Sequence, residues 1–312
     1  MATDVGGSRI KIGLVRNERV LASASIDSMS HNGLKPQLPR IALAFKKLIE
    51  SAGVSISECG ALGMAFPSLV DSATCRVLAA YGKYTDAPMV DLSQWARTAF
   101  GLDLVLENDA RAALVGEWRA GAGENCNDLV MVTLGTGLGT SAIIGGQLLR
   151  GKHGQAGVLG GHFTIRPGGR LCTCGNRGCA EAEASTSVLE RIILEQPEFM
   201  TSRIRELERI DYVGLFRLAR EHDACAVKIR ARTIEVWTAM IVNLIHAYDP
   251  VRVIVGGGIL AGADQFFADL VASVKALAHT PWGTVEIVPA ILEDDAALVG
   301  CDFLARERRL SS

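Results

Sequence analysis

One glycine-rich stretch, residues 157–181, concentrates side chains that bind metal ions. It contains His162, Cys172, Cys174 and Cys179, with glycine and asparagine in the gaps between the cysteines. Thiolate sulfur and imidazole nitrogen are the ligands that Zn²⁺ takes in tetrahedral structural sites. The spacing therefore predicts a closed zinc site, in which four protein ligands leave no open position for a catalytic water. Two alternatives stay open: three reduced thiols beside a surface histidine, and a redox pair, although Cys-x-Cys fits the CxxC pattern poorly.

Three glycine-rich turns adjoin apolar runs and could bind phosphate. Glycine lets backbone N–H groups approach an anion closely, and a nearby carboxylate can hold Mg²⁺ through water. Each turn alone is a weak signal, but three in this order are a much stronger one. None is a P-loop, because GxxxxGK[ST] is absent, and the turn GTGLGT is not followed by the helix of a dinucleotide-binding motif. The residues concerned are Asp4, Gly6, Gly7 and Ser8; Gly135, Thr136 and Gly137; and Gly256, Gly257 and Gly258.

A carboxylate stands where an expected strand becomes an expected helix, in the run LVLENDARAALVGEW. One interpretation makes Asn108 or Asp109 an ordinary N-cap of that helix. The other makes Asp109 the base that accepts the proton of a substrate hydroxyl in phosphoryl transfer and orients that hydroxyl. The residues alone favour neither interpretation.

These candidate residues need a scaffold, and hydrophobic patterning predicts an α/β chain. A strand–glycine turn–strand pattern opens the chain and recurs from residue 129, which predicts a duplicated α/β unit with a cleft between the copies. In the first half we expect strands at residues 8–15, 19–26, 59–66 and 103–108 and helices at 41–53, 90–101 and 109–121. In the second half we expect helices at 187–196, 213–222, 225–250, 263–278 and 294–310 and strands at 251–258 and 284–289. The longest helix should bury the stripe Val227, Ala231, Ile234, Ile241, Leu244 and Tyr248.

Size and composition bound the class of protein. The 312 residues, 49% of them hydrophobic, suffice for one large domain or two moderate ones. The net charge of −2 indicates no basic face for nucleic acid. No signal peptide or membrane-length apolar run is present, so we expect a cytoplasmic protein that binds neither nucleic acid nor membrane. The scattered cysteines are predicted to be buried, reduced thiols: Cys59, Cys75, Cys126, Cys225 and Cys301.

Taken together, the motifs resemble those of the ROK family (repressor, open reading frame, kinase) of sugar kinases, within the actin-like ATPase/hexokinase superfamily. DVGGS is similar to the family's DxGGT, ENDARAALVGE to ENDxNAAxxGE, LGTGLGT to LGTGxGG, and VGGGI to its adenosine-side glycine strand. The most specific match is GH…CTCGNRGCAE, which resembles the zinc signature CxCGxxGCxE. The resemblance covers almost the whole chain.

The resemblance implies a two-lobed actin-like ATPase (ribonuclease H-like) fold with an active-site cleft and a zinc-binding loop. We expect an N-terminal α/β domain over residues 1–110 and 294–312, and a C-terminal α/β domain with the zinc loop over 111–293. The family's usual assembly is a homodimer or a dimer of dimers. Its repressors carry a DNA-binding helix-turn-helix before the first phosphate loop, and because that loop begins here at residue 4, we expect no such helix-turn-helix.

The resemblance also implies ATP and Mg²⁺ at the three glycine turns and a structural Zn²⁺. Asp109 would be the catalytic base toward a sugar hydroxyl, most often the one at C6. The sugar-side residues it implies are Asn108, Asp109, His162 and Glu181, and the zinc ligands are His162, Cys172, Cys174 and Cys179.

The sequence departs from the family on the sugar side. The family reads AGExGH before the zinc cysteines, and its glutamate binds sugar hydroxyls. Here residues 156–162 read AGVLGGH, which is one residue longer and has Val158 where an acid is expected. Loss of a charge-assisted acceptor removes an interaction of about 1.5–3 kcal/mol. We therefore expect a substrate other than plain glucose, such as an amino sugar, a ketose, a polyol or an acidic sugar.

Other departures introduce possible new contacts. AAYGKYTDAP, with Tyr81, Lys83 and Tyr84, stands where the family has PNLxxW. Arg111 replaces the second asparagine of ENDxN, and Ser68 replaces the glycine of PGxVD in the loop FPSLVD. Lys83 and Arg111 could contact a modified sugar, or they could be solvated surface residues.

Three functions fit these observations. The first is an active sugar kinase, favoured by the intact DVGG, END and GTG loops. The second is a sugar-sensing or regulatory protein of the same fold that no longer turns over. The third is an actin-like ATPase without a sugar substrate, against which the zinc signature argues.

Overall fold

The computed structural model describes residues 1–80 and 82–310, so Tyr81 lies outside the described residues. The chain forms two compact units. The first comprises Met1–Cys126, Gln147–Ala156 and Ile291–Ser312, and the second comprises Asn127–Gly146 and Gly157–Ala290.

This division differs from the expected boundary after residue 110, and the reason lies in helix packing. Helix α3 (Asp109–Ala120) packs along α9 (Ala296–Leu310), so it belongs to the first unit. The two backbones touch: a Cβ on Gly116 would lie 2.0 Å from the carbonyl oxygen of Ala296, and one on Gly300 would lie 1.8 Å from that of Ala112. Only glycine permits so close a crossing.

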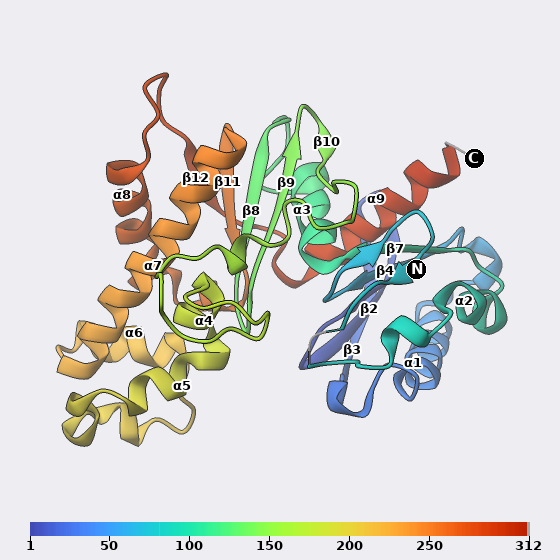
Figure 1. Ribbon diagram of the computed structural model, residues 1–312. Coiled ribbons are helices and arrows are strands. Elements are labelled where there is room, and N and C mark those ends of the chain that lie inside the picture. The colour runs from blue at the N-terminus through green and yellow to red at the C-terminus, as the bar shows by residue number, and fades with distance from the viewer. Residues whose placement is uncertain (81, 311–312) are drawn as a thin grey trace. The chain divides into compact units, whose positions relative to one another are not determined.

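The chain contains two five-stranded sheets, and the two sheets have the same topology. The first has the order β3-β2-β1-β4-β7 and the second the order β10-β9-β8-β11-β12 (Figure 1). In each sheet the first two strands form an antiparallel hairpin and the first strand then pairs in parallel with a later one. The predicted duplication is thereby confirmed. The strands are β1 (Ala2–Val5), β2 (Arg9–Arg16), β3 (Arg19–Asp27), β4 (Leu62–Phe66), β7 (Leu104–Asn108), β8 (Leu129–Leu134), β9 (Leu138–Ile144), β10 (Gln147–Leu148), β11 (Arg252–Gly256) and β12 (Glu286–Pro289), besides the small pair β5 (Val70–Asp71) and β6 (Arg76–Val77).

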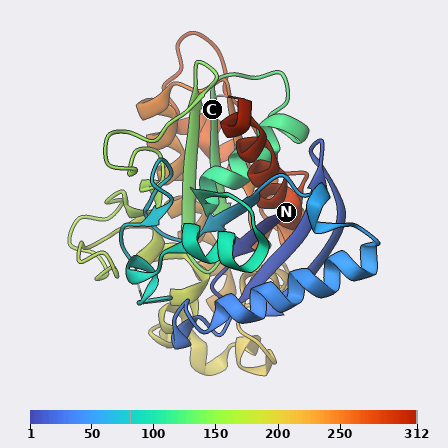
Figure 2. The same ribbon diagram turned by 90° about the vertical axis from the view of Figure 1, so that its right-hand side faces the viewer.

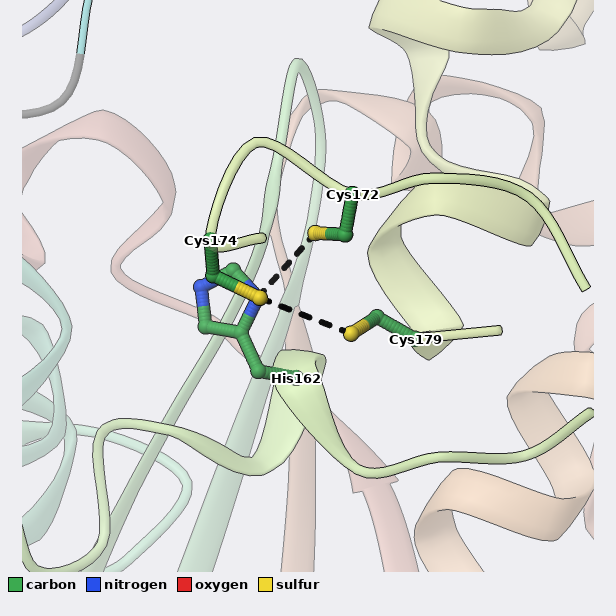
Figure 3. A group of neighbouring side chains, drawn as sticks. All are labelled: His162, Cys172, Cys174 and Cys179. Carbon is green, nitrogen blue, oxygen red and sulfur yellow. Dashed lines mark hydrogen bonds between the residues drawn. The ribbon is translucent and has the colours of Figure 1, made fainter. Parts of the chain in front are cut away.

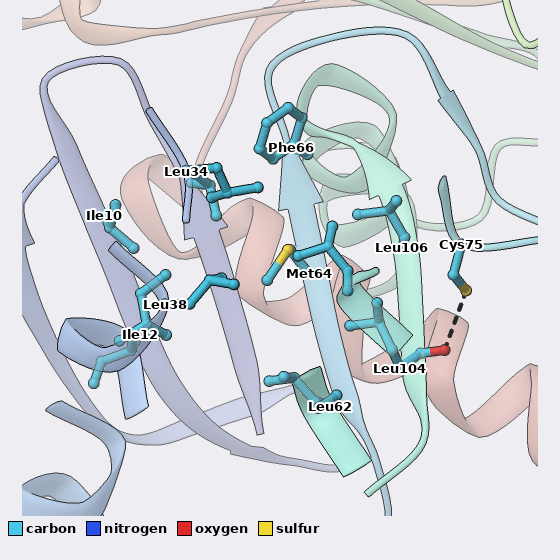
Figure 4. Packing of buried hydrophobic residues seen from close by; sticks show 14 of the residues in the cluster. Ile10, Ile12, Leu34, Leu38, Leu62, Met64, Phe66, Cys75, Leu104 and Leu106 are labelled. Atoms are coloured by element: carbon cyan, nitrogen blue, oxygen red, sulfur yellow. Dashed lines mark hydrogen bonds between the residues drawn. The ribbon is translucent and has the colours of Figure 1, made fainter. Parts of the chain in front are cut away.

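The core of the first unit lies between its sheet and two helices. Helix α1 (Gln37–Ala52) runs across the β2–β3 hairpin (Figure 2), and α2 (Leu92–Phe100) packs near β7. Side chains of β2, β4 and β7 meet those of α1 in this core (Figure 4). Strand β4 is buried along its whole length, as a central parallel strand should be. The carboxyl ends of β4 and β7 are therefore firmly fixed, and β7 leads directly into Asn108 and Asp109.

The core of the second unit surrounds α7 (Ala224–Tyr248). The predicted stripe of this helix is confirmed at Ile234, Ile241 and Leu244, which are buried. It is wrong near the start of the helix, where Val227 and Ala231 are exposed and Ile229 is buried instead. Trp237 is the centre of an aromatic cluster with Tyr212, Phe216 and Phe266. The other helices of this unit are α4 (Ala180–Ala184), α5 (Thr186–Leu194), α6 (Tyr212–Arg220) and α8 (Phe267–Leu277).

No helix that the structure describes combines the length and the apolar character needed to cross a membrane. Of the five scattered cysteines, Cys75, Cys126, Cys225 and Cys301 are buried as predicted, whereas Cys59 is partly exposed.

Candidate active site and metal centre

The first glycine turn, between β1 and β2, presents its amides rather than its carbonyls. The carbonyl of Gly6 accepts a hydrogen bond from Tyr84 Oη at 2.8 Å, and that of Gly7 accepts from Ser28 and Ser30 Oγ at 2.7 and 2.8 Å. The amides of Gly6 and Gly7 donate to no partner within the residues that the structure describes. A Cβ on Gly6 would lie 2.6 Å from the carbonyl oxygen of Arg9, so the turn requires glycine there. Unpaired amides on one side of a turn form an anion-binding site.

Two half-buried carboxyl groups belong to the same unit as this turn. Burial, followed by repulsion from Asp109, raises the pKa of Asp4 to about 7, although the cations Arg9 and Lys11 oppose the shift. Burial likewise raises the pKa of Asp109 to about 6, although hydrogen bonds and the Lys83 ammonium oppose the shift. Two partly desolvated carboxyls with elevated pKa values fit a site that takes up a cation or a proton.

The structure divides the cap and carboxylate roles between neighbouring residues. Asn108 is the N-cap of α3: its Oδ1 accepts the N–H of Arg111 at 3.2 Å. Its Nδ2 donates to the carbonyl of Ser68 and to Asp109 Oδ1. Asp109 Oδ1 also accepts the N–H of Ala110 at 2.8 Å, and the second carboxylate oxygen receives neither bond. Since Asn108 supplies the cap, Asp109 is available for chemistry.

If Asp109 is a general base, kcat/KM should depend on pH with the sign that its pKa dictates. A base acts as the anion, and the anion fraction falls as the pH falls through the pKa, here about 6. We therefore expect kcat/KM to be constant above about pH 7 and to fall about tenfold per pH unit well below pH 6. Initial rates at saturating Mg²⁺ and ATP over this range would measure it. A kcat/KM that falls only near pH 3.9, about the ordinary pKa of aspartate, would contradict the elevated pKa.

The interpretation of Arg111 as a substrate contact is wrong. Its side chain is fully buried and its guanidinium pairs with Glu107. It also donates to the carbonyls of Leu149, Arg150, Gly154 and Ala156. Arg111 therefore holds the segment 149–156 against α3. Ser68 has a similar role, since its hydroxyl bonds the carbonyl of Ala79.

The second and third glycine turns lie side by side in the second unit. Strands β8 and β11 are parallel neighbours, with Gly256 opposite Thr133, so both turns emerge at one edge of the sheet. Gly257 has φ +96°, and a Cβ on it would lie 2.3 Å from the carbonyl oxygen of Leu134, which precedes the second turn. Glycine is therefore required at position 257 for two reasons: its positive φ and its close contact with the Leu134 carbonyl oxygen.

The segment after the third turn differs from the expected helix. A 3-10 helix, η7 (Gly258–Gln265), follows Gly257, and α8 begins only at Phe267. Gly258 has open space where its Cβ would lie. The helix N-terminus next to this turn is therefore 3-10, and Gly258 is not sterically required.

Glu181 contacts the second glycine turn directly. Its Oε2 accepts the N–H of Leu138 at 2.9 Å and lies 2.5 Å from where a Cβ of Gly137 would be. The carbonyls of Gly135 and Thr136 accept N–H bonds from Thr186 and Ser187 at the start of α5. Helix α4 and the start of α5 therefore fix this turn from one side.

The aromatic core of the second unit positions α4. Tyr212 Oη and Trp237 Nε1 both donate to the carbonyl of Ala184, at 2.9 and 3.1 Å. Glu183 is buried and forms ion pairs with Arg170 and Arg232. Because α4 is held at both places, Glu181 has a fixed orientation.

Residues 157–161, the lengthened segment before His162, are hydrogen-bonded to β9 through Thr140. The hydroxyl of Thr140 donates to the carbonyl of Gly157 at 2.6 Å and accepts the N–H of Gly160 at 2.9 Å. A Cβ on Gly161 would lie 2.0 Å from the carbonyl oxygen of Leu138. Thr140 stands at the last position of LGTGLGT, where the motif LGTGxGG has glycine. The two departures from the motifs are therefore in direct contact.

The four predicted metal ligands converge (Figure 3). Cys172 Sγ lies 3.5 Å from His162 Nδ1, Cys174 Sγ lies 3.7 Å from Cys179 Sγ, and all four ligand atoms lie within 4.8 Å of one another. Sulfur ligands of a tetrahedral Zn²⁺ at about 2.3 Å are roughly 3.8 Å apart, so the set fits this ion. Because His162 faces the cysteines with Nδ1, its Nε2 stays available for another partner.

Without a bound cation, the surroundings favour the neutral thiols of Cys172 and Cys179. Burial raises the pKa of the Cys172 thiol, and burial together with hydrogen bonding to Cys174 raises that of Cys179 to about 12. A divalent cation would stabilise the thiolates that these surroundings disfavour. Asn176 supports the set, because its Nδ2 donates to Cys179 Sγ at 3.5 Å.

Several residues that support the site were not predicted from the sequence as site residues. Ser28, Ser30 and Tyr84 bond the carbonyls of the first turn, and Thr140 bonds the segment before His162. Each lies far along the chain from its partner, and no local motif marks such a contact. Tyr84 and Thr140 carry a partial signal, because each stands where the sequence departs from a family motif, PNLxxW and LGTGxGG respectively.

Comparisons with known proteins agree with this arrangement. The family model described as "ROK family" matches residues 1–308. A glucokinase of Thermotoga maritima is 31% identical over 99% of this chain and 97% of its own length. An N-acetylmannosamine kinase of Haemophilus influenzae is 26% identical over 98% of this chain and 95% of its own length. The crystal structure of a ROK family glucokinase from Streptomyces griseus in complex with glucose and AMPPNP is 30% identical, covers 98% of both chains and superposes with a TM-score of 0.80.

Proposed function

The chain belongs to the ROK family, and from that premise we propose that it is an ATP-dependent sugar kinase. It transfers the γ-phosphoryl group of ATP to a hydroxyl, that of C6, of a hexose or sugar derivative other than plain glucose. The observation that carries this proposal is Asp109, a half-buried carboxylate with a pKa of about 6 in the same unit as the unpaired amides of the first glycine turn.

The first unit supplies the groups for proton and phosphoryl transfer. The amides of Gly6 and Gly7 suit phosphate oxygens, and Asp4 would hold Mg²⁺, whose charge offsets that of the phosphates. Asp109 takes the proton of the sugar hydroxyl as that oxygen bonds to the γ-phosphorus and the bond to ADP breaks. Both N–H groups of the Asn108 amide are engaged, so Asn108 could donate to the sugar only by replacing one of these bonds, whereas its Oδ1 accepts one bond and can accept a second from a sugar hydroxyl.

The second unit supplies the groups for the nucleotide and for sugar selectivity. The adjacent turns at Gly135 and Gly257 suit the nucleotide phosphates and adenosine. Glu181 and the Nε2 of His162 suit sugar hydroxyls, and zinc on Nδ1 of His162 would fix the ring in that orientation. The zinc is structural in this proposal, because four protein ligands complete its coordination.

The segment before His162 supports a substrate other than glucose. Val158 offers no acceptor, and Thr140 holds the lengthened segment by two short hydrogen bonds. A carboxylate that binds sugar hydroxyls is therefore replaced by an apolar side chain on a fixed backbone.

A substrate panel tests this selectivity. We expect kcat/KM for the best substrate among mannose, N-acetylated hexosamines, fructose and hexitols, all of which keep a C6 hydroxyl, to exceed that for glucose by about tenfold or more, from the loss of one charge-assisted bond. ADP release measured with each sugar gives the ratios. A matched variant, Val158→Glu, should raise kcat/KM for glucose, and a panel in which glucose ranks first would contradict the proposal.

The same panel separates the kinase from its alternative. A regulatory protein would bind sugar without releasing ADP above the rate without sugar. Binding of the same sugars, followed by calorimetry, would then identify the ligand. We further propose a homodimer or a dimer of dimers, which light scattering of the purified protein measures.

A further inference from the structure

Lys83 lies against the first glycine turn. A Cβ on Gly7 would be 2.3 Å from Lys83 Nζ, so the ammonium occupies the space beside the glycine backbone. Lys83 belongs to the segment AAYGKYTDAP, which replaces the sugar-side PNLxxW of the family motif. A side chain predicted to be a sugar contact or a surface residue is therefore at the phosphate turn instead.

The backbone conformation and hydrogen bonds of the residues around Lys83 keep this residue beside the first glycine turn. Gly82 and Tyr84, on either side, both have positive φ, at +71° and +49°. Positive φ is unfavourable for an aromatic residue, and such strain persists only where the surroundings enforce it. Tyr84 is fully buried, donates its hydroxyl to the carbonyl of Gly6 at 2.8 Å and donates its N–H to the carbonyl of Ser30 at 3.0 Å. The segment that carries Lys83 is thus hydrogen-bonded directly to the first glycine turn, through Tyr84 and Gly6.

The charge of Lys83 acts on the proposed base. Its ammonium is among the groups that lower the pKa of Asp109 against the effect of burial. The ion pairs of this unit use cations such as Lys11, Arg111 and Arg150, and within the described residues none uses Lys83. A half-buried ammonium without an ion-pair partner, next to unpaired amides, is arranged to receive an anion.

We propose that Lys83 is a catalytic residue that binds the transferred phosphoryl group. This inference rests on the proposed kinase function. Asp109 takes the proton of the acceptor hydroxyl, so the γ-phosphorus must be within bonding distance of that oxygen. A cation that lies against Gly7 and whose charge acts on Asp109 is therefore placed to meet the γ-phosphate rather than the nucleoside.

The step balances without an added reactant. The hydroxyl oxygen forms a bond to the γ-phosphorus, the bond from phosphorus to the bridging oxygen breaks, and its electron pair leaves with ADP. Asp109 holds the hydroxyl proton. Lys83 keeps its own protons and stabilises the negative charge on the phosphoryl oxygens.

Three variants test the assignment: Lys83→Met, Lys83→Arg, and Lys47→Met as the control. Lys47 is an exposed lysine on α1 of the same unit. For Lys83→Met we expect kcat to fall by about 10²–10³-fold with KM for the sugar little changed, as when one stabilising donor is removed. Lys83→Arg should recover part of that loss, and Lys47→Met should match the unchanged protein.

Nucleotide binding provides a readout that does not need turnover. By calorimetry, Lys83→Met should weaken AMPPNP by about tenfold or more while leaving ADP nearly unchanged, because only AMPPNP carries the third phosphate. Equal losses for both nucleotides would overturn the assignment to the transferred group, and unchanged affinity for both would overturn any phosphate contact. If the unaltered chain turns over no sugar, the proposed kinase fails, and the AMPPNP-to-ADP ratio still decides whether Lys83 binds the third phosphate.

Discussion

Replacement of Asp109 by asparagine should lower kcat by about 10²–10⁴-fold, the range that loss of a general base produces. Asparagine keeps the shape of the side chain and can still accept the N–H of Ala110, so α3 should form as before. KM for ATP should change little, because Asp109 lies beside the acceptor in the proposed mechanism. Steady-state kinetics on the best sugar, with circular dichroism to verify folding, measure both quantities.

The same variant should be more stable than the unaltered protein at high pH. The pKa of Asp109 is about 6 in the folded chain and about 3.9 in the unfolded one, so the folded state binds the proton more tightly. The stability that protonation gives is complete below about pH 4 and is lost as the pH rises through about 6. We therefore expect the Tm of Asp109→Asn to exceed that of the unaltered chain at pH 8, with the difference vanishing near pH 4. Lower activity together with higher stability marks a functional carboxylate, whereas unchanged turnover would refute its role as the base.

Loss of one cysteine from the metal set should remove the metal and destabilise the zinc loop. Cys174 is the test position, because it is exposed and its replacement by serine leaves no cavity in the core. We expect about one zinc per chain in the unaltered protein. In Cys174→Ser we expect metal affinity to fall by more than the 10–100-fold that loss of an outer-sphere partner costs. Elemental analysis and thermal unfolding measure the two effects, with Cys59→Ser as the control outside the cluster.

Loss of the metal should weaken the binding of the sugar more than the binding of ATP. Cys179 directly precedes α4, which carries Glu181, and His162 provides the fourth ligand. Release of the metal frees both residues, so KM for the sugar should rise more than KM for ATP. A chelator should reproduce this change in the unaltered chain and lower its Tm by mass action, and added Zn²⁺ should reverse it. Protein purified without chelator that contains no zinc would disprove the site.

Much of the fold could be predicted from local patterns. The repeated strand–glycine turn–strand pattern predicted the duplicated sheets, and the end of α1 at Gly53 followed from a glycine in the left-handed conformation. The position of the boundary between the units, after Cys126 rather than after residue 110, could not be obtained in this way. It depends on the contact of Gly116 and Gly300 with backbone nearly two hundred positions away, and no periodicity records such a contact.

The sequence by itself determined the chemistry of this protein: which side chains can bind zinc, which turns can approach phosphate, and which carboxylate can act as a base. Residue type and short spacing suffice for these, because ligand preference and glycine's freedom are local properties. Only the tertiary structure decided how the candidates are used. It buried Arg111 among backbone carbonyls, gave the cap to Asn108 rather than Asp109, and brought Lys83 to Gly7. Each outcome depends on burial and on contacts between distant segments, and these exist only once the chain has folded.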